Sequence, residues 1–146
     1  MFQDARLPAY PDDFHRALDQ TPLDPPAFDA LLQRYGVDVA LLSEPDVNMR
    51  AGSFDPAVWA LVYRADDALV FVRRGHHADV IARDEIPLRV RFRWLGGSHV
   101  EPLWSPPEGI AACEWSRRLV RALVEADLPS VAIEAHRRAE AGCELH

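Results

Sequence analysis

The spacing of apolar residues in the first half of the chain predicts a helix, a buried strand and a β-hairpin. Residues 27–35 carry apolar side chains three and four positions apart, which is typical of an amphipathic helix, and Gly36 is a residue that commonly ends one. The short apolar run at 37–42 favours a buried strand. Residues 59–64 and 68–73 are typical of two strands joined by a polar turn.

The start of the chain adds one more strand and one more helix to this prediction. Residues 2–6 are expected to form a short strand, and residues 11–18 a helical turn or two. A helix, a glycine and an apolar strand in this order form the second half of a βαβ unit, so we expect a small mixed sheet. Residues 76–85 are expected to be a polar connector.

The second half of the chain contains a strict alternation that predicts a half-buried strand. At 88–94 the apolar residues alternate with Arg89, Arg91 and Arg93, which gives the strand one apolar face and one arginine face. A return strand is expected at 99–104 after a glycine turn. From residue 106 onward two amphipathic helices, separated at 127–130, predict an αα-hairpin.

These elements predict an α/β (α+β) fold in one domain, because 146 residues are enough to bury a single core. We divide the chain into an α/β subdomain at 1–75, a connector and β-hairpin at 76–105, and a C-terminal helical hairpin at 106–146 packed on the same domain. The sheet is expected to be small and mixed, with a βαβ start and β-hairpins.

Charge narrows the range of partners. The chain has 16 basic and 23 acidic residues, a net charge of −7, and every basic residue is arginine. This balance argues against generic binding to nucleic acid or to an anionic membrane. The absence of lysine excludes Schiff-base and P-loop lysine chemistry. The sequence shows neither a signal peptide nor a membrane-spanning run, and its strand-like start favours a domain taken from a longer protein.

The two cysteines are placed so that a helical hairpin brings them together. Cys113 lies 14 residues before Asp127, and Cys143 lies 13 residues after Ser130. Positions equidistant from the turn of an antiparallel hairpin face each other, so a disulfide is expected in an oxidising compartment. The alternative is two unrelated thiols, one of them near the chain end.

The candidate chemistry is otherwise sparse. His76, His77 and Asp79 are weak candidates for metal ligands, because adjacent histidines point in different directions and the segment lacks the spacing of a known site. Asp66 and Asp67 are interpreted as solvated turn residues. No catalytic motif is evident, no cofactor is predicted, and whether the chain is an enzyme stays open.

The arginine face of the 88–94 strand is the strongest candidate for ligand binding. Arg89, Arg91 and Arg93 match the geometry of phosphate or carboxylate groups, so the face suits an acidic ligand or partner. The alternative is a solvated face whose arginines pair with acidic neighbours such as Glu101.

Several short motifs together resemble a known bacterial domain. They resemble the extracytoplasmic domain that follows the last membrane helix in polytopic proteins of the C superfamily of glycosyltransferases, related to dolichyl-phosphate-mannose protein mannosyltransferases. The matching segments are Phe2 to Arg6 ending in D-x-R, Tyr10-Pro11, Arg34 to Leu42 with its YGVD sequence, and Trp59 to Arg73 with its D-D turn. The resemblance covers about the first half of the chain.

The resemblance implies a non-catalytic soluble accessory domain linked to cell-envelope glycosyl transfer, on the periplasmic face of the inner membrane. The catalytic acidic residues of that family lie in its membrane portion, so none is assigned here. The implied partner is the transmembrane portion of the parent protein or another envelope protein. The C-terminal helix pair is similar to a single tetratricopeptide-type repeat. The alternatives are a cytoplasmic location, and a module that binds proteins or acidic ligands through the helical hairpin or the arginine face.

Overall fold

The computed structural model describes residues 12–21, 24–43, 50–93 and 97–143; the side chains of residues 92–93 and 97–98 lie outside this description. The helices are α1 (Asp12–Gln20), α2 (Pro25–Arg34), α4 (Ala78–Asp84), α5 (Ala112–Glu125) and α6 (Pro129–Cys143), with a 3₁₀ turn η1 (Ala51–Ser53). The strands are β1 (Val39–Ser43), β2 (Trp59–Arg64), β3 (Ala68–Arg73), β4 (Leu88–Arg93) and β5 (Gly97–Pro102).

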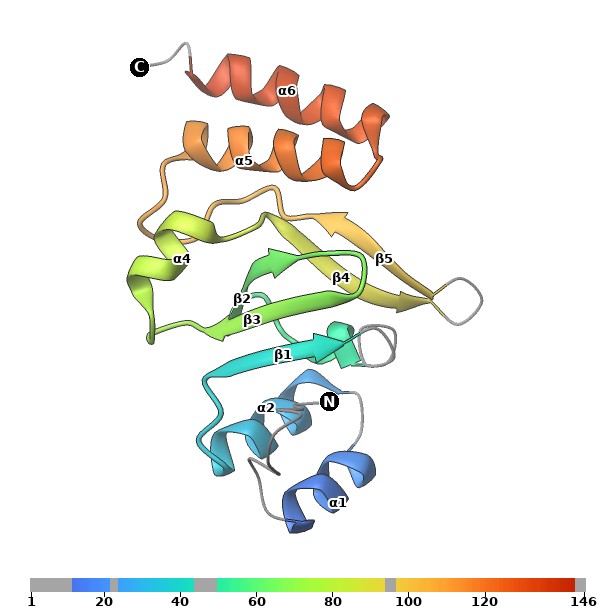
Figure 1. Ribbon diagram of the computed structural model, residues 1–146. Helices are drawn as coiled ribbons and strands as arrows, with labels where there is room; N and C mark the ends of the chain where they lie inside the picture. The colour runs from blue at the N-terminus through green and yellow to red at the C-terminus, as the bar shows by residue number, and fades with distance from the viewer. Residues whose placement is uncertain (1–11, 22–23, 44–49, 94–96, 144–146) are drawn as a thin grey trace.

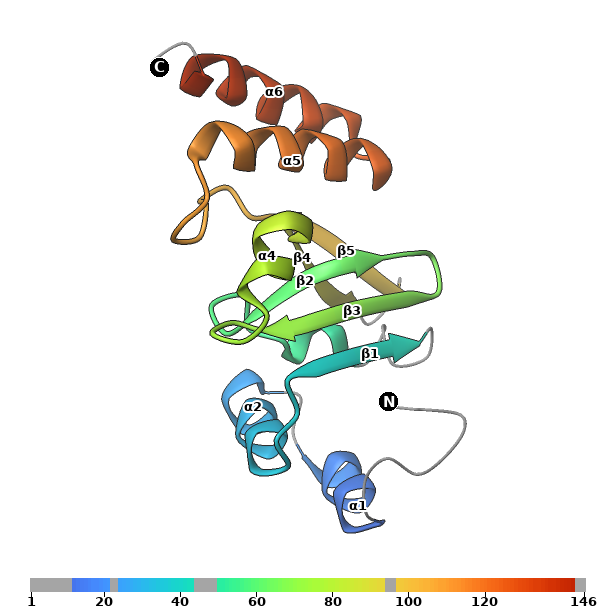
Figure 2. The ribbon, with the colours of Figure 1, turned by 60° about the vertical axis from the view of Figure 1, so that its left-hand side comes forward.

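The elements are stacked along the long dimension of the molecule. Helices α1 and α2 lie at one end, the three-stranded sheet and the β4–β5 ribbon occupy the middle, and the α5–α6 hairpin lies at the other end (Figure 1). Figure 2 shows α4 beside β2, with the ribbon behind the sheet. Helices thus flank antiparallel strands, and the predicted α+β class is confirmed.

The three-stranded sheet has the order β1-β3-β2, and both of its pairings are antiparallel. The predicted hairpin at 59–73 is confirmed as β2–β3. Its register shifts between Leu61 and Tyr63, which is the position of a β-bulge. The mixed sheet expected from the sequence is therefore antiparallel over the described strands. The strand expected at 2–6, which a βαβ unit requires, lies outside the described residues.

Helix α2 shows how local sequence sets the entry into this sheet. Asp24 caps its N-terminus by accepting a hydrogen bond from the Ala27 backbone N–H at 3.2 Å. Gly36 follows the helix with φ +66°, and the Val37 N–H donates to the Leu32 carbonyl at 2.9 Å. This left-handed turn, which glycine adopts without strain, directs the chain into β1.

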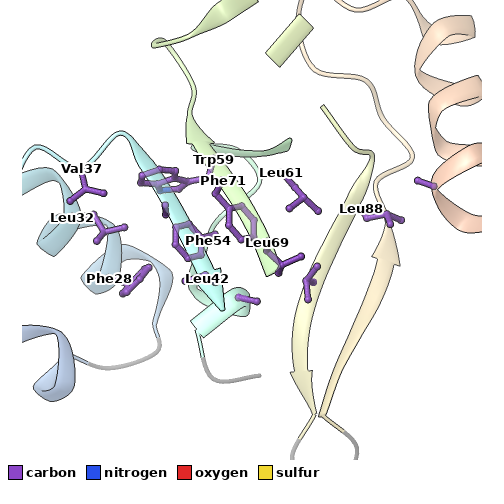
Figure 3. Close-up of a cluster of buried hydrophobic side chains, with 14 of the residues drawn as sticks. Phe28, Leu32, Val37, Leu42, Phe54, Trp59, Leu61, Leu69, Phe71 and Leu88 are labelled. Atoms are coloured by element: carbon purple, nitrogen blue, oxygen red, sulfur yellow. The ribbon is translucent and has the colours of Figure 1, made fainter. Parts of the chain in front are cut away.

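The core is centred on aromatic side chains between the sheet and α2. Phe54, which follows η1, stacks on Phe71 with 4.2 Å between ring centroids and makes edge contacts with Phe28 and Trp59 (Figure 3). The same cluster of buried side chains extends through the ribbon to α5 and α6. One core therefore includes residues from all three segments named in the sequence analysis.

The return strand expected at 99–104 is β5, which begins at Gly97 and ends at Pro102, and two further segments differ more strongly from the sequence prediction. The expected connector at 76–85 contains helix α4, whose Ile81 is partly buried and which packs beside β2. The first C-terminal helix begins at Ala112 rather than at residue 106. Residues 105–111 form a loop because Gly109 adopts φ +88° there, a left-handed conformation that an α-helix does not accommodate.

Candidate functional site

In the β4–β5 ribbon, the predicted arginine face of β4 lies opposite a glutamate and a histidine of β5. In the antiparallel register Arg89 faces Glu101, and Arg91 faces His99. The Glu101 carboxylate does not pair with the arginine directly opposite. One of its oxygens lies 2.8 Å from Arg91 Nε, and the other lies 3.5 Å from His99 Nε2. The predicted pairing of this face with Glu101 therefore holds for Arg91.

Arg89 is left without an acceptor on this face. Its Nε is buried and has no hydrogen-bond partner, and within the described parts of the chain its guanidinium forms neither a hydrogen bond nor an ion pair. The Nδ1 of His99 is also buried and without a partner. Arg93 belongs to β4, but its side chain lies outside the described residues.

A second charged cluster, which the sequence analysis missed, lies between α2 and the β2–β3 hairpin. Arg73 donates to the Asp29 carboxylate at 2.8 Å, and the Trp59 indole N–H donates to the same oxygen at 3.0 Å. The Arg73 guanidinium also lies 4.4 Å from the centre of the Trp59 ring. Trp59 and Arg73 are opposite each other in the β2–β3 ladder. The register of the predicted hairpin could therefore have indicated that these two side chains are neighbours.

A third charged contact joins β3 to the end of α4. Arg74 donates through both terminal nitrogens to the Glu85 carboxylate, which is buried, and its Nε donates to the Pro56 carbonyl at 2.9 Å. The buried carboxylate of Glu85 and the partly buried carboxylate of Asp29 are therefore both paired with arginine. A buried ion pair with this geometry fixes the packing of neighbouring elements.

A cleft of about 440 Å³ lies between α4 and the loop before α5. Its walls are mainly apolar and are formed by Ala78, Ile81, Ala82, Pro107 and Ile110. Its two charged lining residues are Arg74, which is already engaged with Glu85, and Glu108, which is exposed. The cleft offers apolar surface without an arginine free to anchor a ligand.

The weak metal candidates do not converge. His76 lies with Nδ1 3.8 Å from the Asp38 carboxylate, and His77 adopts a left-handed conformation with φ +55° just before α4, where Asp79 occupies the first turn. No group of three or more histidine, cysteine, aspartate or glutamate residues able to hold a metal ion occurs among the described residues. Asp66 and Asp67 are exposed in the β2–β3 turn, as expected.

The two cysteines meet at the open end of the helical hairpin. Cys113 in the first turn of α5 and Cys143 at the end of α6 form a disulfide, with 5.2 Å between their Cα atoms. This is the pairing expected from their equal distance to the turn. Helix α6 packs mainly against α5 and buries three alanines there: Ala132, Ala135 and Ala139.

Comparison with protein-family models, curated proteins and solved structures found no match to this chain. None of the helices in the described residues is long and apolar enough to cross a membrane.

Proposed function

We propose that this chain is an extracytoplasmic accessory domain of a membrane protein linked to cell-envelope glycosyl transfer. The observation that carries the proposal is the disulfide between Cys113 and Cys143. Structural disulfides persist in oxidising compartments such as the periplasm and are rare in the cytosol of mesophilic organisms. This support is independent of the motif resemblance, which lies in the first half of the chain.

The buried charges favour a supporting role over a catalytic one. Asp29 and Glu85 are the carboxylates that sit deepest in charged clusters, and both are neutralised by arginine. A general base needs a carboxylate or imidazole that is free to exchange a proton with a substrate. In this domain these two carboxylates instead join α2 and the end of α4 to the hairpin.

The compartment is tested in cells that contain the protein at its native level. Cells are quenched in acid, and free thiols are modified with a polyethylene-glycol maleimide before electrophoresis. We expect no mass shift unless the sample is first reduced, whereas a Cys113→Ser control must gain one adduct without reduction. In spheroplasts, external protease is expected to digest the domain. Free thiols together with protection from protease would refute the extracytoplasmic proposal.

The link to a membrane protein needs a separate readout. An antibody against the domain is expected to detect it in the membrane fraction, either as part of a polypeptide larger than the 16.4 kDa chain or in complex with one after mild detergent extraction. A 16.4 kDa band found only in the periplasmic fraction would contradict the link and leave the compartment assignment intact.

Binding of an acidic ligand is a second candidate function, and a specific observation favours it. Arg89 lies on the β4–β5 ribbon without an acceptor, while its neighbour Arg91 is paired with Glu101. The helical hairpin has less specific support. Its exposed side chains Val124 and Ile133 are apolar and offer no charge to an acidic ligand. The ribbon is therefore the better location for this function.

A further inference from the structure

Arg89 stands apart from the other arginines that are at least partly buried in the described residues. Each of the others donates to a carboxylate or to a backbone carbonyl; these arginines are Arg50, Arg73, Arg74 and Arg118. Arg89 alone has no such acceptor, although its Nε is buried. The Nε is covered by protein, whereas the terminal nitrogens are not among the buried unpaired atoms, so a ligand can reach the guanidinium through them. A charged donor that gains an acceptor forms a charge-assisted hydrogen bond, which is stronger than a neutral one.

The position of Glu101 explains why Arg89 has no acceptor. Residues directly opposite on one face of an antiparallel ladder are the nearest neighbours, and Glu101 is directly opposite Arg89. Its carboxylate is nevertheless engaged by Arg91 Nε at 2.8 Å and lies 3.5 Å from His99 Nε2. The acceptor that the ladder supplies for Arg89 is thus engaged by Arg91, two residues further along β4.

Charge balance on this face identifies the kind of ligand. Among the side chains that the structure describes on this face, Arg91 and Glu101 neutralise each other, so Arg89 contributes one uncompensated positive charge. A carboxylate balances that charge, and its two oxygens match the guanidinium fork. A phosphate dianion would bring a second negative charge close to Glu101. The second negative charge and the Glu101 carboxylate repel each other.

We propose that Arg89 is the docking point for a carboxylate group of an acidic ligand on the β4–β5 ribbon, with His99 beside it. The Nδ1 of His99 has no partner and is diagonal to Arg89 in the ladder, a separation that long side chains span. This assignment rests on the second candidate function and specifies its site and its ligand. It is independent of the accessory role.

The direct test follows the Arg89 Nε–H signal in ¹⁵N-correlated NMR spectra of the full chain during titration with sodium acetate. Sodium chloride at equal ionic strength serves as the blank, and sodium phosphate tests the competing anion. We expect a saturable downfield shift of the Arg89 signal with acetate, at concentrations on the order of 1–100 mM for a single exposed carboxylate. The signals of Arg73 and Arg74, which are already paired, are expected to stay in place.

Two variants with the same charge change separate the site from the net charge of the protein. Arg89→Gln is expected to weaken acetate binding at least about tenfold, the effect of losing a charge-assisted contact. Arg121→Gln removes an equal charge from the exposed surface of α5 and is expected to leave binding unchanged. Equal loss in both variants, or no shift of the Arg89 signal in wild type, would overturn the assignment.

Glu101→Gln is a gain-of-binding test that does not depend on the folding of the Arg89 variant. Releasing Arg91 from its ion pair doubles the uncompensated charge, so acetate is expected to bind several-fold more tightly. Unchanged or weaker binding would contradict the proposal, and so would phosphate binding tenfold tighter than acetate in wild type.

A glutamate-rich peptide separates the failure of this site from the failure of the second candidate function. Peptide binding that survives Arg89→Gln would refute the site and keep the acidic-ligand function. Absence of peptide binding to the wild-type chain would refute both.

Discussion

Removing the Cys113–Cys143 disulfide is expected to cost a large share of the stability of the domain. The bond closes a loop with a sequence separation of 30 residues. In the chain-entropy description this closure removes about 12 cal/mol/K from the unfolded state, or about 3.6 kcal/mol at 25 °C. Small domains have free energies of unfolding of about 5–15 kcal/mol, so the bond accounts for a substantial fraction of the total.

The loss should be concentrated in α6. This helix has its main contacts with α5 and buries only alanines: Ala132, Ala135 and Ala139. An alanine side chain has little apolar area to remove from water, so this interface contributes less than a leucine-rich one. Without the bond, α6 is expected to open locally before the sheet unfolds.

The assay is urea unfolding monitored by circular dichroism, with wild type compared to Cys113→Ser/Cys143→Ser. We expect the midpoint of the variant to fall by about 2 M if the slope is about 2 kcal/mol/M. Reductant should lower the wild-type midpoint to the same value and leave the double variant unchanged. Hydrogen exchange should show that α6 loses protection first. A midpoint shift below about 0.5 M would refute the loop-closure reasoning.

Three further results are expected from the same structure. Asp29→Asn should lower stability by about 1.5–3 kcal/mol, because it removes the carboxylate to which Arg73 donates at 2.8 Å and leaves only Asp38 at 3.6 Å; chemical denaturation measures this. Phe54→Ala should cost about 3–5 kcal/mol by the same assay, because it opens a cavity at the centre of the aromatic core. The hydrogen bond from Arg138 holds the pKa of Glu134 below its ordinary value of 4.5. The pair therefore stabilises the fold at pH values above 4.5. This contribution is lost as the pH falls through the lowered pKa. An NMR titration should find the lowered pKa, and Arg138→Gln should raise it.

Each of these results has a matched control. Asp66→Asn removes an exposed turn carboxylate and should change stability by less than about 0.5 kcal/mol. Val124→Ala truncates an exposed side chain and should be equally mild. Arg121→Gln should leave the pKa of Glu134 where it is. If Asp66→Asn proved as costly as Asp29→Asn, the Arg73 pairing would not be the source of the effect.

The elements that the sequence predicts best are those with regular local patterns. The alternation at 88–93 specified both faces of β4, since Leu88 and Val90 are buried while Arg91 is exposed. The spacing of residues in α2 and the following Gly36 located the end of that helix. The hairpin at 59–73 followed from its two apolar runs. In each case the information lies within about ten residues of sequence.

The features that the sequence did not reveal depend on contacts between distant residues. Asp29 and Arg73 are separated by 44 positions, and nothing near Asp29 indicates that its partner lies at the end of the hairpin. Helix α4 has only seven residues and buries none of them, and its place beside β2 is a contact between separate elements. Tertiary packing decides such segments.

On the arginine face of β4, the structure distinguishes two residues that the sequence pattern treats alike. Period-two spacing makes Arg89 and Arg91 equivalent, and the sequence offers Glu101 as a partner for either. The ladder places Glu101 opposite Arg89, yet the carboxylate binds Arg91 and lies near His99. One carboxylate cannot neutralise two arginines. The pairing of Glu101 therefore determines which of the two arginines can bind a ligand. Substitution of Glu101 or of Arg91 therefore changes both halves of the face, whereas substitution of Arg89 leaves the Arg91–Glu101 pair in place.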